Sequence, residues 1–241
     1  MRYFAKRIAV ITGAGSGIGR AIALELASHG ATLCLLGRNA QALDAVAAVA
    51  RTRVENVQAY EVDLTVEEDI VQLADRLQNG YGRVDMLVHS AGVIRIGPLE
   101  TADSSGFDRQ YFTNVRAPFL LTQKLLPLLR RCKGQVVFIN SSAGILAGAN
   151  VGLYAATKHA LKAIADSLRQ EVNADGIRVV SVYPGRTATP MQKSVCEREG
   201  KIYKPERLSQ PEDIAQTVIH ALSLPRTSEI TDVRIRPMVK L

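Results

Sequence analysis

The chain has 241 residues, 47% of them hydrophobic, and a formal net charge of +7. This composition supports one sizeable core. The apolar run near the N-terminus breaks at Gly13, too early for a signal peptide, and no apolar span of about 18 residues follows, so we expect a cytoplasmic protein with no membrane segment. The three cysteines are widely spaced and the four histidines scattered, which favours reduced structural thiols and no metal site.

The positive charge alone is compatible with nucleic acid, an acidic membrane surface or a small polyanion as partner. The densest basic cluster, Arg130 to Lys133, falls where a helix should end, and cations there complement the helix dipole. No basic strip interleaved with aromatic residues suggests a base-stacking surface. We therefore expect no nucleic-acid partner.

Strand-like apolar runs alternate with helical patterns along almost the whole chain. Strands are expected at 6–12, 32–37, 57–63, 83–90, 134–142, 177–185 and 229–237, and helices at 17–29, 40–51, 66–79, 107–129, 153–172 and 210–224. Seven strands and six helices predict an α/β fold: a single doubly wound (Rossmann) domain over residues 1–241, with a seven-stranded parallel sheet and helices on both faces.

The segment from Arg186 to Ser209 is predicted to be irregular and is too long for an ordinary connection. It follows the sixth strand at the sheet edge where ligands bind in open α/β folds, so we expect it to be a substrate lid. Arg186, Lys193 or Arg198 within it could meet an acidic substrate.

A glycine-rich turn joins the first strand to the first helix, with glycines at 13, 15, 17 and 19. Such a turn lets backbone approach a pyrophosphate at the helix N-terminus, although Ile18 breaks the strict GxGxxG spacing and a plain tight connection is the alternative. Arg38 ends the second strand with no acid at Gly37, which suggests a 2′-phosphate and hence NADP rather than NAD. A solvated surface arginine is the alternative.

Tyr154 and Lys158 stand four residues apart at the start of a predicted helix, so both lie on one face. A cation beside a phenol favours phenolate, although an exposed Tyr and Lys on a helix is the favoured interpretation of a YxxxK motif that stands alone. Pro118 cannot donate to the Asn114 carbonyl, which leaves that oxygen to a water, or marks a simple helix kink.

Together the TGxxxGxG turn, the arginine and the YxxxK motif resemble the classical short-chain dehydrogenase/reductase family over essentially the whole chain. The resemblance implies catalytic roles for Asn114, Ser141, Tyr154 and Lys158; Ser141 stands thirteen residues before Tyr154, whereas Ser142 is one residue too close. One departure is that the usual NNAG reads His89-Ser90-Ala91-Gly92, and we expect His89 to be structural rather than catalytic.

The resemblance also implies a set of cofactor contacts. These are Gly13, Ser16, Gly17, Ile18, Gly19, Arg38, Asp63, Leu64, Ala91, Gly92, Tyr154, Lys158, Pro184, Gly185, Thr187 and Thr189.

The function expected is NADP(H)-dependent interconversion of a carbonyl and a secondary alcohol on a small molecule, with Tyr154 as general acid and base. Lys158 would lower the Tyr154 pKa by roughly three units, and Ser141 would donate to the substrate oxygen. A non-catalytic NADP(H) sensor is the alternative. Dehydratase or epimerase chemistry is an outside alternative within the family, because relatives with those activities usually have longer chains with an added substrate domain. The resemblance further implies a homodimer or homotetramer.

Overall fold

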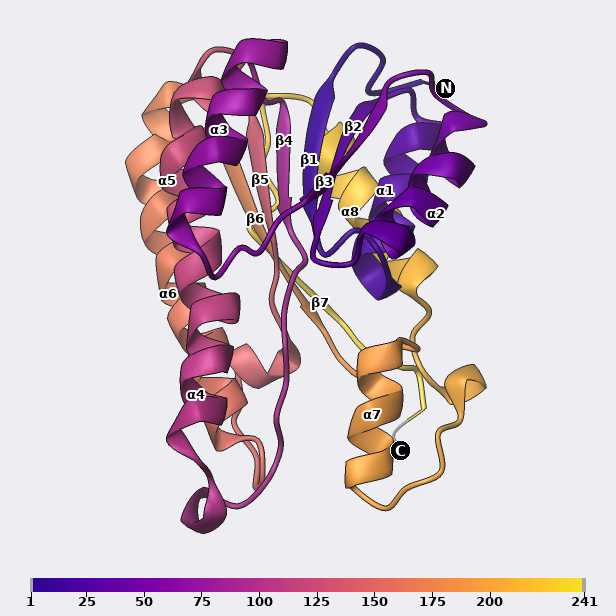
Figure 1. Cartoon of the computed structure of the whole chain (residues 1–241), viewed down its shortest axis with the longest axis vertical. Helices are drawn as coiled ribbons and strands as arrows, with labels where there is room; N and C mark the ends of the chain where they lie inside the picture. Colours follow the sequence, from indigo (N-terminus) through magenta and orange to yellow (C-terminus); the bar gives the residue numbers. More distant parts are fainter. Residues whose placement is uncertain (1, 240–241) are drawn as a thin grey trace.

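The computed structural model describes residues 2–239, which form a central sheet with helices on both sides (Figure 1). The sheet has seven strands in the order β3-β2-β1-β4-β5-β6-β7, and every neighbouring pair is parallel. The strands are β1 (Ile8–Thr12), β2 (Thr32–Gly37), β3 (Val57–Glu61), β4 (Met86–His89), β5 (Gln135–Ile139), β6 (Arg178–Pro184) and β7 (Asp232–Ile235). The predicted fold class is confirmed.

Helices α1, α2 and α8 cover one face of the sheet, and α3, α5 and α6 cover the other (Figure 1). Side chains alternate along each strand, so Ala9 and Ile11 join the apolar cluster on the first face while Ile8 and Val10 join the cluster on the second. The α-helices are α1 (Gly17–Ser28), α2 (Ala40–Arg51), α3 (Glu67–Tyr81), α4 (Ser104–Tyr111), α5 (Ala117–Arg130), α6 (Gly152–Val172), α7 (Pro190–Arg198) and α8 (Pro211–Ser223).

The segment from Arg186 to Ser209 is not irregular as predicted, because it contains α7 and a short 3-10 helix at Pro205–Arg207. The Thr189 hydroxyl accepts a hydrogen bond from the Gln192 amide at 3.1 Å, and Pro190 occupies the first turn. A capping threonine followed by proline is a strong helix start, and it outweighs the short length of this helix.

The predicted helix at 107–129 is also divided in the structure. It begins at Ser104, where Asp103 accepts from the Gly106 amide, and a π turn at Phe112–Arg116 separates α4 from α5. Pro118 lies in the first turn of α5 and has no amide hydrogen. The irregularity expected at Asn114 is therefore present as a π turn.

The strand order reverses at β1. From β1 the chain moves outward through β2 and β3, then returns to place β4 on the other side of β1. Connections from the carboxyl ends of β1 and β4 thus leave in opposite directions and open a crevice between them. The candidate site residues gather at this edge.

Candidate active site

The turn between β1 and α1 packs directly against the backbone that follows β4. Gly13 has φ +65°, and a Cβ there would stand 2.9 Å from the Ala91 Cα, while a Cβ on Gly19 would stand 2.4 Å from the Gly13 carbonyl oxygen. Thr12 reinforces this packing, since its hydroxyl accepts from the amides of Ser90 and Ala91, each at 3.0 Å. Only glycine fits at positions 13 and 19, and the turn is held close to β4.

The first turn of α1 has no side-chain cap. Ser16 precedes the helix without bonding to its amides, and no acidic residue lies in the first turn. Helices α2, α4 and α7 are capped by Asn39, Asp103 and Thr189, whereas α3, α5 and α6, like α1, have no side-chain cap. Residues 17–19 line a cavity of about 460 Å³, so the uncapped amides face a space in which an anion would complete their hydrogen bonds.

A second cavity of about 330 Å³ continues from the glycine turn towards the end of β2, where exposed Arg38 lines it with Asp63 and Leu64. The Asp63 Oδ1 accepts from the Thr65 amide at 2.9 Å and from the Thr65 hydroxyl at 2.8 Å. Burial acts to raise the pKa of Asp63, but these bonds and the charge of Arg38 outweigh it, so the carboxyl pKa is lowered. The Arg38 cation and the fixed Asp63 carboxylate therefore lie at the same end of this cavity.

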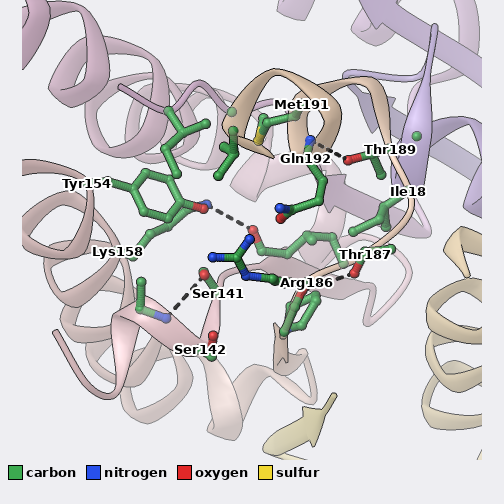
Figure 2. A pocket seen from close by; sticks show the side chains of 18 of the residues that line it. Ile18, Ser141, Ser142, Tyr154, Lys158, Arg186, Thr187, Thr189, Met191 and Gln192 are labelled. Atoms are coloured by element: carbon green, nitrogen blue, oxygen red, sulfur yellow. Dashed lines mark hydrogen bonds between the residues drawn. The ribbon is translucent and has the colours of Figure 1, made fainter. Parts of the chain in front are cut away.

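Ser141, Tyr154 and Lys158 line the larger cavity together, although they come from the end of β5 and from α6 (Figure 2). The Ser141 Oγ accepts from the Ala143 amide at 3.1 Å. The Lys158 Nζ donates to the Ile139 carbonyl at 3.1 Å and lies 5.8 Å from the centroid of the Tyr154 ring. The structure therefore brings three of the four predicted catalytic residues to one cavity.

The charge states differ from the sequence-based expectation that Lys158 lowers the Tyr154 pKa. Burial raises the pKa of Tyr154, with the Ser141 hydroxyl acting in the opposite direction, and burial lowers the pKa of Lys158 to about 8. Both groups are buried, and burial disfavours the charged form of each. The pKa of Tyr154 is therefore raised and not lowered, which is opposite to the direction expected from its spacing to Lys158.

Asn114 lies behind the cavity and does not line it. Its Oδ1 accepts from the Val93 amide at 2.9 Å, and its Nδ2 donates to the Val93 carbonyl at 2.9 Å and to the Thr157 hydroxyl at 3.1 Å. The side chain therefore fastens the segment after β4 to α6, next to Lys158. Its carboxamide holds the walls of the site together.

The last residue of β6 and the residues after it form the opposite wall of the cavity. Pro184, Gly185, Thr187 and Thr189 all line it, but the hydroxyls of the two threonines form hydrogen bonds with nearby backbone groups. The Thr187 hydroxyl donates to the Gly185 carbonyl at 3.1 Å, and that of Thr189 caps α7. A parallel bridge between Thr187 and Ser209 closes the base of the segment that carries α7.

One polar residue of the cavity had no role in the sequence-based site: Asn140 is 5% exposed and bonds to both Ser141 and Lys158. Arg186, which was expected as a possible contact for an acidic substrate, forms an ion pair with Glu199 at 2.6 Å. An asparagine before the serine was visible in the sequence, but its partner on α6 is eighteen residues away, and no local pattern indicates that contact.

His89 lies at the end of β4 and is 4% exposed. Its Nε2 lies 2.8 Å from the Thr122 hydroxyl, and its ring stacks on Phe138 with centroids 4.9 Å apart. Burial lowers the pKa of His89 to about 3, so the ring is neutral at ordinary pH. These contacts fit the structural role expected for it, and the neighbouring Ser90 lines the cavity.

The sequence matches the short chain dehydrogenase family over residues 7–200. An uncharacterized oxidoreductase of Staphylococcus epidermidis is 32% identical over 234 residues, covering 97% of this chain and 98% of that protein. An alcohol dehydrogenase from Thermococcus sibiricus, complexed with 5-hydroxy-NADP, superimposes with a TM-score of 0.89 at 27% identity over 98% of each chain. A putative short chain dehydrogenase from Escherichia coli, complexed with NADPH, has a TM-score of 0.89 at 34% identity, covering 97% of this chain and 98% of that one.

The chain therefore belongs to the short-chain dehydrogenase family and is an oxidoreductase of that family. Within residues 2–239, no helix combines the length and apolar character needed to cross a membrane.

Proposed function

We propose that this protein is an NADP(H)-dependent oxidoreductase that interconverts a carbonyl and a secondary alcohol. The observation that carries the proposal is that Ser141, Tyr154 and Lys158 line the same cavity as the uncapped first turn of α1. The NADP-type ligands in the two similar solved structures support the choice of cofactor.

The described residues fit a phosphorylated dinucleotide. The uncapped amides of residues 17–19 suit its pyrophosphate, and Arg38 suits the 2′-phosphate because no carboxylate stands at the end of β2 to repel it. Asp63 and Leu64 would border the adenosine, while Pro184, Gly185 and Thr187 would border the nicotinamide. When bound, the nicotinamide supplies or accepts the hydride.

The protein residues must manage the charge that develops on the substrate oxygen. A neutral buried Tyr154 phenol holds the proton that this oxygen needs during carbonyl reduction, and an alkoxide is a far stronger base than a phenolate. Ser141 can donate a hydrogen bond to the same oxygen. Lys158, with a pKa of about 8, is mostly charged at neutral pH and would stabilise the phenolate left behind. A protonated Tyr154 beside a charged Lys158 is the form of the site from which carbonyl reduction starts.

The test is NADPH consumption against a panel of ketones, with NADH alongside, for wild type and Tyr154→Phe. The variant should lose at least about a hundredfold in turnover, because it lacks the transferable proton, while binding NADPH normally. Binding is measured by the fluorescence of NADPH itself, since the chain has no Trp. Retained turnover in Tyr154→Phe would place the chemistry elsewhere, and tight NADPH binding with no turnover on any ketone would favour the sensor.

We also propose that the segment from Arg186 to Ser209 acts as a lid over the cavity. Its ends are joined by the bridge between Thr187 and Ser209, and α7 within it lines the cavity. Hydrogen exchange in α7 should slow when NADPH binds, whereas unchanged exchange would show that the segment does not close over the cofactor.

A homodimer or homotetramer is the assembly we propose. Tyr111, Phe112 and Phe119 are 44%, 42% and 44% exposed along α4, the π turn and α5, which is costly for large apolar side chains on a monomer. Light scattering should give a molar mass of two or four times 26.1 kDa, and the double variant Phe112→Ser/Phe119→Ser should have a lower mass. A monomeric wild type would refute the assembly.

A further inference from the structure

A third cavity, of about 530 Å³, adjoins the catalytic one on its outer side. The segment after β4, one side of α4 and one side of α7 enclose it. The two cavities share the lining residues Gly92, Ile94, Ile96, Met191 and Val195. A molecule whose reactive group lies beside Tyr154 can therefore extend past an apolar section into this outer cavity.

The charged residues lining the outer cavity are all basic. Arg95, Arg109 and Arg198 come from the segment after β4, from α4 and from α7. Arg95 pairs with Asp103 at 2.7 Å, whereas Arg109 and Arg198 form no ion pair with any residue of the described range 2–239. Arg109 and Arg198 come from different helices and line one space, so an anion between them would meet both guanidinium groups, although the charge of Arg109 also acts on Asp63 and lowers its pKa.

In the catalytic cavity the arginine is paired with a carboxylate. Arg186 lines it, but Glu199 holds its guanidinium at 2.6 Å, and Lys201 meets the same carboxylate at 3.1 Å. A cation that already has a carboxylate partner gains less from a second anion. The arginines without an ion pair therefore lie at the outer end of the connected cavities, whereas beside the reacting carbonyl the cations are the paired Arg186 and Lys158, which donates to the Ile139 carbonyl.

We propose that the substrate combines a carbonyl or alcohol group, an apolar middle section and a remote anionic group, which binds between Arg109 and Arg198. The proposal rests on the oxidoreductase function proposed above and names its substrate class. Carboxylate and phosphate share the chemistry that two arginines recognise. A 2-oxo acid, whose carboxylate adjoins the carbonyl, is a poor substrate because its charge falls beside the matched Arg186.

The test uses ketones that carry a carboxylate at increasing distance from the carbonyl, each paired with its methyl ester, plus oxoalkyl phosphates of the same lengths. Reduction is measured at saturating NADPH for wild type, Arg109→Gln, Arg198→Gln and the double variant. At the best distance between carbonyl and anion, the kcat/KM of the acid or phosphate should exceed that of the ester by at least about tenfold. Each variant should lower the kcat/KM of the acid or phosphate about tenfold by raising its KM. The ester rates and the KM for NADPH should not change.

Arg76→Gln is the matched control, because Arg76 lies on α3, is exposed and lines none of the three cavities. It should behave as wild type. Added salt should weaken the binding of the acids and leave the binding of the esters unchanged. Preference for carboxylate or for phosphate identifies the source of the anion, and both support the proposal.

Equal rates for acids and esters would overturn the proposal while leaving the oxidoreductase function intact. A rise in the KM for NADPH with no change for acids would assign the arginines to the cofactor instead. Calorimetric titration of the same acids into protein saturated with NADP⁺ gives a readout independent of turnover. If the wild type binds the acids, the double variant does not, and no ketone is reduced, the anion site is supported and the proposed reaction is refuted.

Discussion

The Asn140 side chain donates a hydrogen bond to the main-chain carbonyl of Lys158 at 3.1 Å, which joins the end of β5 to α6 inside the candidate active site. The Asn140 Oδ1 also accepts from the Ser141 amide at 2.9 Å. Gly144 leaves room for this side chain, since a Cβ there would stand 2.4 Å from the same Oδ1. One carboxamide thus fixes the backbone at both Ser141 and Lys158.

Asn140→Ala should lower the free energy of unfolding by about 1–3 kcal/mol, because the half-buried Ser141 amide loses its partner and the buried Lys158 carbonyl loses one of its hydrogen bonds. Turnover should fall as well, since Ser141 and Lys158 are no longer held in register. Urea unfolding and kcat measure the two effects. Asn79→Ala, at an exposed position of α3, should change neither by a comparable amount. Unchanged stability and turnover in Asn140→Ala would show that the contact is dispensable.

Gly19→Ala should abolish NADPH binding, because its methyl group would overlap the Gly13 carbonyl and open the turn. Gly80→Ala, inside α3, is the matched control: a Cβ there has no neighbour within 4 Å. It should keep binding and gain about 0.5–1 kcal/mol of stability from the helix. Cofactor fluorescence and thermal unfolding distinguish the two variants, and normal binding by Gly19→Ala would contradict the close packing described.

Arg38→Asp should weaken NADPH binding by at least about a hundredfold and leave NADH binding much less affected, because a guanidinium–phosphate pair becomes a repulsive carboxylate–phosphate pair. Titration of both cofactors by their fluorescence gives the ratio. Arg38→Gln removes the charge without adding repulsion and should lie between wild type and Arg38→Asp. Equal losses for the two cofactors would remove Arg38 from recognition of the 2′-phosphate.

His89 should make the protein sensitive to mild acid. Burial lowers its pKa from 6.5 to about 3, so below pH 6.5 the unfolded chain takes up a proton that the folded chain does not. The free energy of unfolding therefore falls as the pH falls, and His89 accounts for about 2 kcal/mol of loss between pH 7 and pH 5.

Denaturation of His89→Asn at the two pH values measures this contribution. The variant should lose about 2 kcal/mol less than wild type on going from pH 7 to pH 5, whatever its stability at pH 7. His220→Asn reports the effect of removing an exposed imidazole. An identical pH dependence in wild type and His89→Asn would mean that His89 is protonated within the folded protein.

Much of the fold could be predicted because local signals agreed with the tertiary structure. Helix α2 begins and ends where expected, since Asn39 caps its start and an apolar face recurs from Leu43 to Ala50. Helix α7 was missed because nine residues carry little periodicity, although its Thr-Pro start was in the sequence. The π turn could be anticipated from Pro118 but its form could not.

The site was predictable where chemistry follows sequence spacing, as for Tyr154 and Lys158. It was not predictable where folding joins distant segments: the bond from Asn140 to Lys158 depends on how β5 packs against α6. The direction of the Tyr154 pKa shift was also mistaken, because residue spacing gives the position of a charge but not the loss of water around it.

The uncapped first turn of α1 has a consequence for the lifetime of the protein. Amides that lack partners in the free chain gain them when an anion binds, so a ligand held at tens to hundreds of times its Kd adds roughly 2–3 kcal/mol to the folded state. Degradation acts mainly on opened molecules, so scarcity of the dinucleotide would shorten the survival of each copy. The amount of this protein would then follow the supply of its own cofactor.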